Sequence, residues 1–157
     1  MIKPGGVIAK AEMLIRKPVA QVFEAFMDPG ITSGFWFTKG SGRLEPGKEV
    51  RWEWEMYGVS LQVAVKVVEE NKRIVVEWPG LGTPTTVEWI FTPRADNTTF
   101  VSITNSGYIG DEEAVVKQAL DSTEGFTLVL CGLKAYLEHK IRLNLVADRF
   151  PDASKKN

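Results

Sequence analysis

The sequence has very little of the chemistry that most metal and redox sites require. Its 157 residues include one cysteine, Cys131, and one histidine, His139. A lone cysteine forms no internal disulfide, which agrees with a reducing compartment. A conventional zinc site needs several nitrogen or sulfur ligands. The sequence therefore predicts no internal disulfide and no conventional zinc site. A metal held only by carboxylates is left open, but no ligand spacing indicates one, so no metal and no cofactor is assigned.

The sequence also has no large excess of positive or negative charge and no long apolar run. The formal net charge is -1, so no overall field would attract the protein to nucleic acid. No stretch approaches the ~18 consecutive apolar residues of a membrane-spanning helix. Residues 1–6 lack the apolar run of a secretory signal. We expect a cytoplasmic protein with no nucleic-acid partner and no membrane span.

The length and composition favour one globular domain. A chain of 157 residues lies within the usual size of about 100–200 residues per domain, and 44% of the residues are hydrophobic. No linker or repeat divides the chain. We predict a single domain over residues 1–157, with an ordered core at about residues 7–150.

The first forty residues predict a strand followed by two short helices. Residues 7–15 are apolar and alternating enough for the strand. Pro18 suits the first turn of a helix, and its apolar face recurs at helical spacing in Val19, Val22, Phe23 and Phe26. Asp28 followed by Pro29 is a second helix-start signal.

The middle of the chain alternates with the period of two that is typical of half-buried strands. Val50, Trp52, Trp54 and Met56 alternate with charged residues. Further strands are expected at residues 61–67, 73–78, 85–92 and 99–104, and Pro79–Gly82 is expected to be a loop. Successive strands joined by short turns indicate an antiparallel sheet with one dry face.

The last third predicts a long helix. Asp111 and the acidic residues after it favour a helix N-terminus, and Phe126, Leu130, Leu133 and Leu137 form an apolar stripe with Leu120 nearby. Gly125 is expected to mark a break or bend between a short helix and the long one. Residues 143–150 have no clear pattern, and the chain is expected to fray from Pro151 onward.

These elements predict an α+β fold in which a curved antiparallel sheet wraps around the long C-terminal helix. Two short helices follow the first strand. Large aromatic residues on the dry face of such a sheet suit the wall of a pocket.

Three segments resemble START-type SRPBCC proteins, and most of all the branch similar to the activator of the heat-shock protein 90 ATPase. They are residues 18–37, with Asp28-Pro29 and Phe35-Trp36-Phe37, the helix 125–139, and the tail 143–152. The resemblance implies a helix-grip fold of strand, two helices, six strands and long helix around a hydrophobic cavity. Its members include lipid carriers, hormone receptors, polyketide cyclases and co-chaperone domains. It implies no catalytic residue, because the superfamily has no universal catalytic motif.

The candidate ligand-binding residues are the apolar side chains expected to face the space between sheet and helix. They are Phe35, Trp36, Trp52, Trp54, Met56, Trp78, Trp89, Phe91, Phe126, Leu130 and Leu133. For the tryptophans, lining a cavity and filling the core are both open. For residues 35–37, gating the cavity mouth and anchoring the preceding helix are both open.

Other reactive residue types lack a catalytic arrangement. Arg51, Glu53, Glu55, Glu77 and Glu88 lie on the strand phase opposite to the aromatics, so we expect them on the outer face. Cys131 and His139 are eight residues apart, roughly 12 Å along a helix, too far for a nucleophile–base pair. No catalytic residue is assigned.

Three functions remain open from the sequence. The leading hypothesis is a binding module for a small apolar or amphipathic molecule, without catalysis. The first alternative is a cyclase- or aromatase-like enzyme in which polar residues such as Tyr57, Ser102 or Asn105 converge in the pocket. The second is a chaperone-accessory domain, although the chain has no room for the separate N-terminal domain that such activators carry. Homodimerisation is left open.

Overall fold

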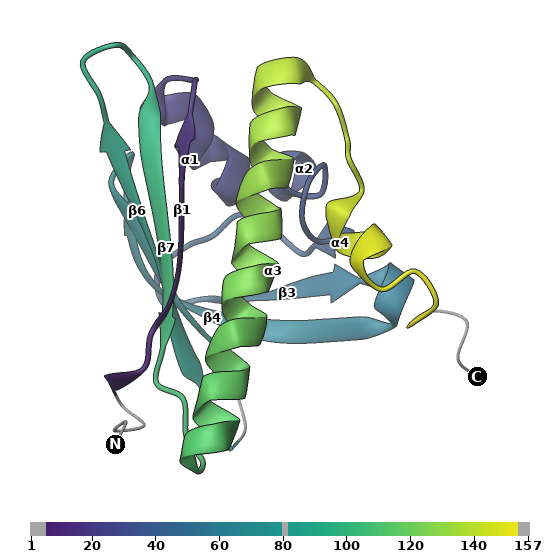
Figure 1. The fold of residues 1–157 in the computed structure, drawn as a ribbon. Coiled ribbons are helices and arrows are strands. Elements are labelled where there is room, and N and C mark those ends of the chain that lie inside the picture. Colours follow the sequence, from purple (N-terminus) through teal and green to yellow (C-terminus); the bar gives the residue numbers. More distant parts are fainter. Residues whose placement is uncertain (1–5, 80–81, 154–157) are drawn as a thin grey trace.

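A seven-stranded antiparallel sheet curves around one long helix (Figure 1). The computed structural model describes residues 6–79 and 82–153. The strand order is β1-β7-β6-β5-β4-β3-β2, so β1 and β2 form opposite edges of the sheet. This arrangement confirms the predicted α+β helix-grip fold. Six strands follow the two short helices, as the family resemblance implies, and five of them were located from the sequence pattern.

The strands are β1 (Ala9–Ile15), β2 (Lys39–Gly40), β3 (Glu49–Trp54), β4 (Val59–Glu69), β5 (Arg73–Trp78), β6 (Thr85–Pro93) and β7 (Thr99–Ser106). The helices are α1 (Val19–Met27), α2 (Pro29–Thr32), α3 (Glu112–His139) and α4 (Leu145–Arg149). The predicted loop at Pro79–Gly82 includes residues 80 and 81, which lie outside the described residues, as do residues 1–5 and 154–157 at the two ends.

The two short helices begin where the sequence indicates. Pro18 precedes α1, and the Asp28 carboxylate accepts a hydrogen bond from the Gly30 N–H at 2.9 Å, which caps α2. The chain crosses through α1 and α2 from the β1 edge to the β2 edge of the sheet. It thereby brings Phe35, Trp36 and Phe37, all buried, beneath α3.

Helix α3 is a single continuous helix from Glu112 to His139, so the expectation of a separate short helix before Gly125 is wrong. Asp111 caps its first turn by accepting from the Ala114 N–H at 2.8 Å. One glycine costs about 1 kcal/mol relative to alanine, and the packed turns on both sides of it outweigh that cost. Lys134 Nζ also donates to the Leu14 carbonyl at 2.8 Å, which ties α3 to β1.

The apolar stripe of α3 is confirmed for four residues and wrong for a fifth. Phe126, Leu130, Leu133 and Leu137 are buried against the sheet, whereas Leu120 is 66% exposed. Leu120 lies six residues before Phe126, which turns it about 120° around a helix of 3.6 residues per turn. It therefore faces away from the sheet.

Three local features differ from the sequence predictions or go beyond them. Met56 lies in a short 3-10 helix (Glu55–Tyr57) instead of a strand, and Gly58 with φ 62° then reverses the chain. The two-residue strand β2 was not predicted, because two residues carry no periodic pattern. The tail of unclear pattern contains α4, which follows Asn144 with φ 57°.

No helix among the residues that the structure describes is long and apolar enough to cross a membrane.

Candidate ligand cavity

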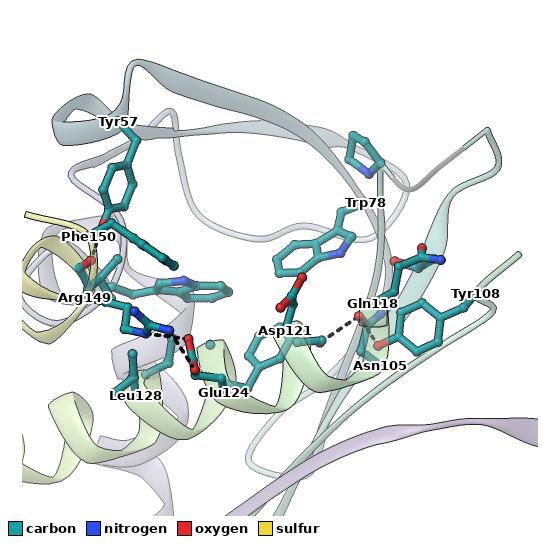
Figure 2. Close-up of a pocket in the computed structure, with 18 residues that line it drawn as sticks. Tyr57, Trp78, Asn105, Tyr108, Gln118, Asp121, Glu124, Leu128, Arg149 and Phe150 are labelled. Carbon is teal, nitrogen blue, oxygen red and sulfur yellow. Dashed lines mark hydrogen bonds and ion pairs between the residues drawn. The ribbon is translucent and has the colours of Figure 1, made fainter. Parts of the chain in front are cut away.

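A cavity of about 550 Å³ lies between α3, the inner face of the sheet and the C-terminal tail. Figure 2 shows its two ends: Tyr57, Arg149 and Phe150 lie at one, and Asn105, Tyr108 and Gln118 lie at the other, with Trp78 between them. We call these the tail end and the polar end.

The middle of the cavity is aromatic. Trp78, at the end of β5, stacks on Phe126 of α3 with ring centroids 5.4 Å apart and an interplanar angle of 13°. The ring centroid of Trp36 lies 5.8 Å from that of Phe126 and 6.1 Å from that of Trp78. All three line the cavity, which gives it an aromatic wall suited to apolar ligands.

The polar end is organised by Asn105 on β7, which is 3% exposed. Its Nδ2 donates to the Thr86 carbonyl at 2.9 Å. Its Oδ1 accepts from the Tyr108 hydroxyl at 2.7 Å and from the Ser122 hydroxyl at 2.9 Å. The arrangement joins β6, β7 and α3 through buried and partly buried hydrogen bonds, which fix the orientation of the Asn105, Tyr108 and Ser122 side chains.

Two more groups at the polar end bear on ligand chemistry. The Thr85 Oγ1 is buried and has no hydrogen-bond partner among the described residues, and Thr85 lines the cavity. Burial raises the pKa of the Tyr108 hydroxyl above its usual range, although its proximity to Ser122 partly offsets that increase. Tyr108 is therefore a neutral hydroxyl at physiological pH.

The tail end is made by α4 and the residue after it. The Tyr57 hydroxyl donates to the Val146 carbonyl and lies 3.3 Å from the Ala147 carbonyl oxygen. Phe150 packs edge-on against Tyr57 at 6.3 Å. Arg149 forms an ion pair with Glu124 of α3; the hydrogen bond from Arg149 lowers the pKa of that carboxyl.

Three of the eleven candidate ligand-binding residues line this cavity: Trp36, Trp78 and Phe126. Ligand contact by these three stays a prediction. The other eight lie outside its wall and pack in the core or against it: Phe35, Trp52, Trp54, Met56, Trp89, Phe91, Leu130 and Leu133.

The core explains why most of the inward aromatics do not reach the cavity. Trp52 is 2% exposed and stacks on Phe37 with centroids 5.1 Å apart. Trp89 is 1% exposed and lies 5.9 Å from Phe26. Helices α1 and α2 and residues 35–37 therefore cover this part of the sheet. Of residues 35–37, Trp36 also lines the cavity, whereas Phe35 and Phe37 pack in the core.

Sequence reasoning missed most of the polar wall. Tyr57 and Asn105, considered for an enzyme, do line the cavity, whereas Ser102 lies on the opposite phase of β7. Tyr108, Ser122 and Thr85 were not singled out. The inward phase of β6 and β7 could have indicated Thr85 and Asn105, but nothing in the sequence places Tyr108 or Ser122 beside them.

The charged and reactive residues outside the cavity form no catalytic arrangement. Glu88 lies on the outer face, as expected from its strand phase, and forms an ion pair with Arg73 of the neighbouring strand β5. His139 has a 66% exposed side chain at the end of α3. Within residues 6–79 and 82–153, no group of three or more His, Cys, Asp or Glu side chains could hold a metal ion.

Comparison with solved structures supports the fold independently. A protein from Staphylococcus saprophyticus, SSP2350, is 31% identical over 87% of this chain and 96% of its own, with a TM-score of 0.75. The Aha1 dimer from Colwellia psychrerythraea is 18% identical over 85% of this chain and 97% of its own, with a TM-score of 0.72. DynU16, from the dynemicin biosynthetic locus, is 21% identical over 86% of this chain and 48% of its own, with a TM-score of 0.71.

A comparison with curated proteins gives no significant match. A sequence model of one family, however, matches residues 16–138, which extend from the end of β1 almost to the end of α3. These residues include the two short helices, six strands and the aromatic wall. The chain therefore belongs to the family of Activator of Hsp90 ATPase homolog 1-like proteins.

Proposed function

We propose that this protein binds a small apolar or amphipathic molecule in the cavity between α3 and the sheet. The observation that carries the proposal is a cavity of about 550 Å³ with a stacked aromatic wall. Binding sites for small molecules typically enclose about 300–1,000 Å³ and combine apolar walls with a few fixed polar groups. Both features are present here, and the polar groups gather at one end.

Binding without catalysis is the simplest use of this wall. Among the residues that the structure describes, three charged side chains line the cavity: Glu124 and Arg149 hold each other, and Asp121 is a single carboxylate with no second carboxylate paired to it in the wall. The hydroxyl of Tyr57 is taken by the backbone of α4. Acid–base catalysis needs a titratable group within hydrogen-bond reach of the reacting atom and with a pKa near the working pH. The raised pKa of Tyr108 moves that hydroxyl away from such a role.

Native mass spectrometry tests the proposal directly. The protein is purified without detergent, and native and denaturing spectra are recorded side by side. We expect an added mass in the native spectrum that disappears on denaturation, and extraction then identifies the molecule. A chain that carries no added mass and also fails to bind 1-methylpyrene, a flat apolar probe, would contradict the proposal.

An enzyme of the cyclase or aromatase kind is the second candidate. The convergence of Asn105, Tyr108 and Ser122 in the cavity favours it, because neutral hydrogen bonds can position a substrate without a strong nucleophile. The extracted molecule, incubated again with fresh protein, distinguishes the two candidates. Recovery of the molecule unchanged supports binding, and a time-dependent change in its mass supports catalysis.

Protein partners are a separate question. A second copy of this chain is one proposed partner, and the Colwellia relative is itself a dimer. Light scattering at several protein concentrations measures the mass in solution. The chaperone-accessory role is tested by a pull-down with purified Hsp90, and failure to recover it would contradict that role.

A further inference from the structure

The orientation of the Asn105 amide determines what the polar end can offer a ligand. A backbone carbonyl only accepts hydrogen bonds, so the group that faces the Thr86 carbonyl at 2.9 Å must be the amide nitrogen. The amide oxygen then faces the hydroxyls of Tyr108 and Ser122, at 2.7 and 2.9 Å. Both hydroxyls must therefore donate to Asn105.

Each of these hydroxyls has one hydrogen, and that hydrogen is already used. The oxygens of Tyr108 and Ser122 consequently have only lone pairs left for a ligand. Thr85 can supply a donor, because its buried hydroxyl has no partner among the described residues and keeps both its hydrogen and its lone pairs. The amide nitrogen of Gln118 is also engaged, because it donates to the Ile109 and Ala114 carbonyls at 3.0 and 3.1 Å. The polar end thus offers acceptors at Tyr108 and Ser122, and Thr85 is the group there that can donate.

The charges of the cavity wall also disfavour an anionic group on the ligand. Arg149 is the one cationic side chain among the described residues that line it, and its guanidinium is engaged by Glu124 through contacts of 2.7 and 3.2 Å. Asp121, on α3 between the two ends, adds a further carboxylate (Figure 2). A ligand carboxylate at the polar end would meet lone pairs and negative charge, with no available cation.

We propose that the ligand carries a hydroxyl group, an alcohol or a phenol, which lies at the polar end of the cavity. The hydroxyl donates to Tyr108 or Ser122 and accepts from Thr85, while the apolar body lies against Trp78 and Phe126. A hydroxyl is the smallest neutral group that both donates and accepts. This inference rests on the proposed binding function and adds the chemical class of the ligand.

Three probes of the same shape test the class. They are 1-pyrenemethanol, 1-methylpyrene and pyrene-1-carboxylate, titrated into the protein and followed by pyrene fluorescence. In a purely apolar cavity the alcohol would bind more weakly than the hydrocarbon, because burying an unpaired hydroxyl is unfavourable. We expect the alcohol to bind about 3- to 10-fold more tightly, the gain typical of one or two net hydrogen bonds, and the carboxylate to bind most weakly.

Variants then assign the effect to residues. Thr85→Val removes the unpaired hydroxyl and keeps the side-chain shape, and Ser122→Ala removes one acceptor. Thr85→Val should bring the affinity for the alcohol close to that for 1-methylpyrene, whose own affinity should not change. Ser122→Ala should lower the affinity for the alcohol less, because Tyr108 remains as an acceptor. Thr104→Val on the outer phase of β7 is the matched control and should behave as the unmodified protein does.

The outcomes separate this inference from the proposed function. If 1-methylpyrene binds but the alcohol binds more weakly, the hydroxyl class is wrong and the binding function stands. Tightest binding by the carboxylate would likewise overturn the hydroxyl class alone. Failure of all three probes to bind contradicts the binding function itself, and this inference with it.

Discussion

Arg149 of α4 and Glu124 of α3 join the tail to the long helix across the tail end of the cavity. Arg149 Nε lies 2.7 Å from Glu124 Oε1, and a second guanidinium nitrogen lies 3.2 Å from Oε2. Both side chains are nearly half exposed. Because Phe150 follows Arg149 directly and also lines the cavity, the ion pair helps to hold this part of the wall, together with the contacts of Tyr57 to Val146 and Phe150.

Removing the ion pair should speed ligand entry with little effect on stability. Exposed ion pairs contribute little to folding, so Glu124→Gln should leave the urea midpoint almost unchanged. The association rate of 1-methylpyrene, measured by stopped-flow fluorescence, should rise several-fold. Glu113→Gln, in the first turn of the same helix, is the control. Equal rates in both variants and in the unmodified protein would show that α4 does not limit entry.

Lowering the pH should raise the association rate of 1-methylpyrene, as Glu124→Gln should. The hydrogen bond from Arg149 lowers the pKa of Glu124. Glu124 therefore stays charged to a lower pH in the folded protein than in the unfolded chain. The contribution of the pair is complete above the ordinary glutamate pKa of about 4.3 and is lost as the pH falls through the lowered value. The association rate should therefore be flat at neutral pH and rise in acid, and Glu124→Gln should abolish the rise.

The periodic elements of this fold could be predicted from the sequence because burial selects side chains at fixed spacing. The alternation around Trp52 and the stripe at Phe126, Leu130 and Leu133 both reflect one buried face. Leu120 was misplaced because six residues span a turn and two thirds, which moves it off the stripe. The strand β2 and helix α4 were missed because elements of two and five residues carry no period.

The candidate site was harder to predict than the fold. The inward phase of Trp52, Trp78 and Trp89 is local information, but whether an inward tryptophan meets other side chains or open space depends on distant segments. Phe37 covers Trp52, whereas Trp78 ends its strand beside the cavity. The contact between Asn105 and Ser122 joins residues on different elements, and no spacing rule indicates it.

Two glycines of α3 should respond oppositely to alanine. A Cβ at Gly125 would have nothing within 4 Å, whereas a Cβ at Gly132 would lie 3.1 Å from the Phe35 carbonyl oxygen. Alanine is favoured over glycine in a helix by about 1 kcal/mol. Gly125→Ala should therefore raise the free energy of unfolding by about 0.5–1 kcal/mol.

At Gly132 the close backbone contact should outweigh the helix preference, because Phe35 is buried and has little room to move. Gly132→Ala should lower the free energy of unfolding, as measured by urea denaturation of both variants. Equal stabilisation by the two substitutions would mean that the segment at Phe35 adjusts freely beneath α3.

Alkaline pH should destabilise the protein through Tyr108. Burial raises its pKa in the folded state above the ordinary value of 10.0, so the folded protein holds this proton more tightly than the unfolded chain does. The contribution is complete below the ordinary value and is lost as the pH rises through the raised one. The unfolding free energy above about pH 10 should fall more steeply for the unmodified protein than for Tyr108→Phe, and parallel curves would contradict this.

The two tryptophans Trp78 and Trp52 should separate ligand binding from folding. Trp52 is 2% exposed and surrounded by core side chains, so Trp52→Leu should lower the free energy of unfolding by about 3 kcal/mol and leave the affinity for 1-methylpyrene within about twofold. Trp78 is only partly buried and forms the cavity wall. Trp78→Leu should cost less stability but weaken 1-methylpyrene about 10-fold, since a stacked aromatic pair contributes about 0.5–1.5 kcal/mol beyond its buried area. Urea denaturation and fluorescence titration of the same two variants give both quantities. If Trp52→Leu weakened the probe as much as Trp78→Leu does, the ligand would have to lie deeper, within the aromatic core, and the cavity between α3 and the tail would not be its site.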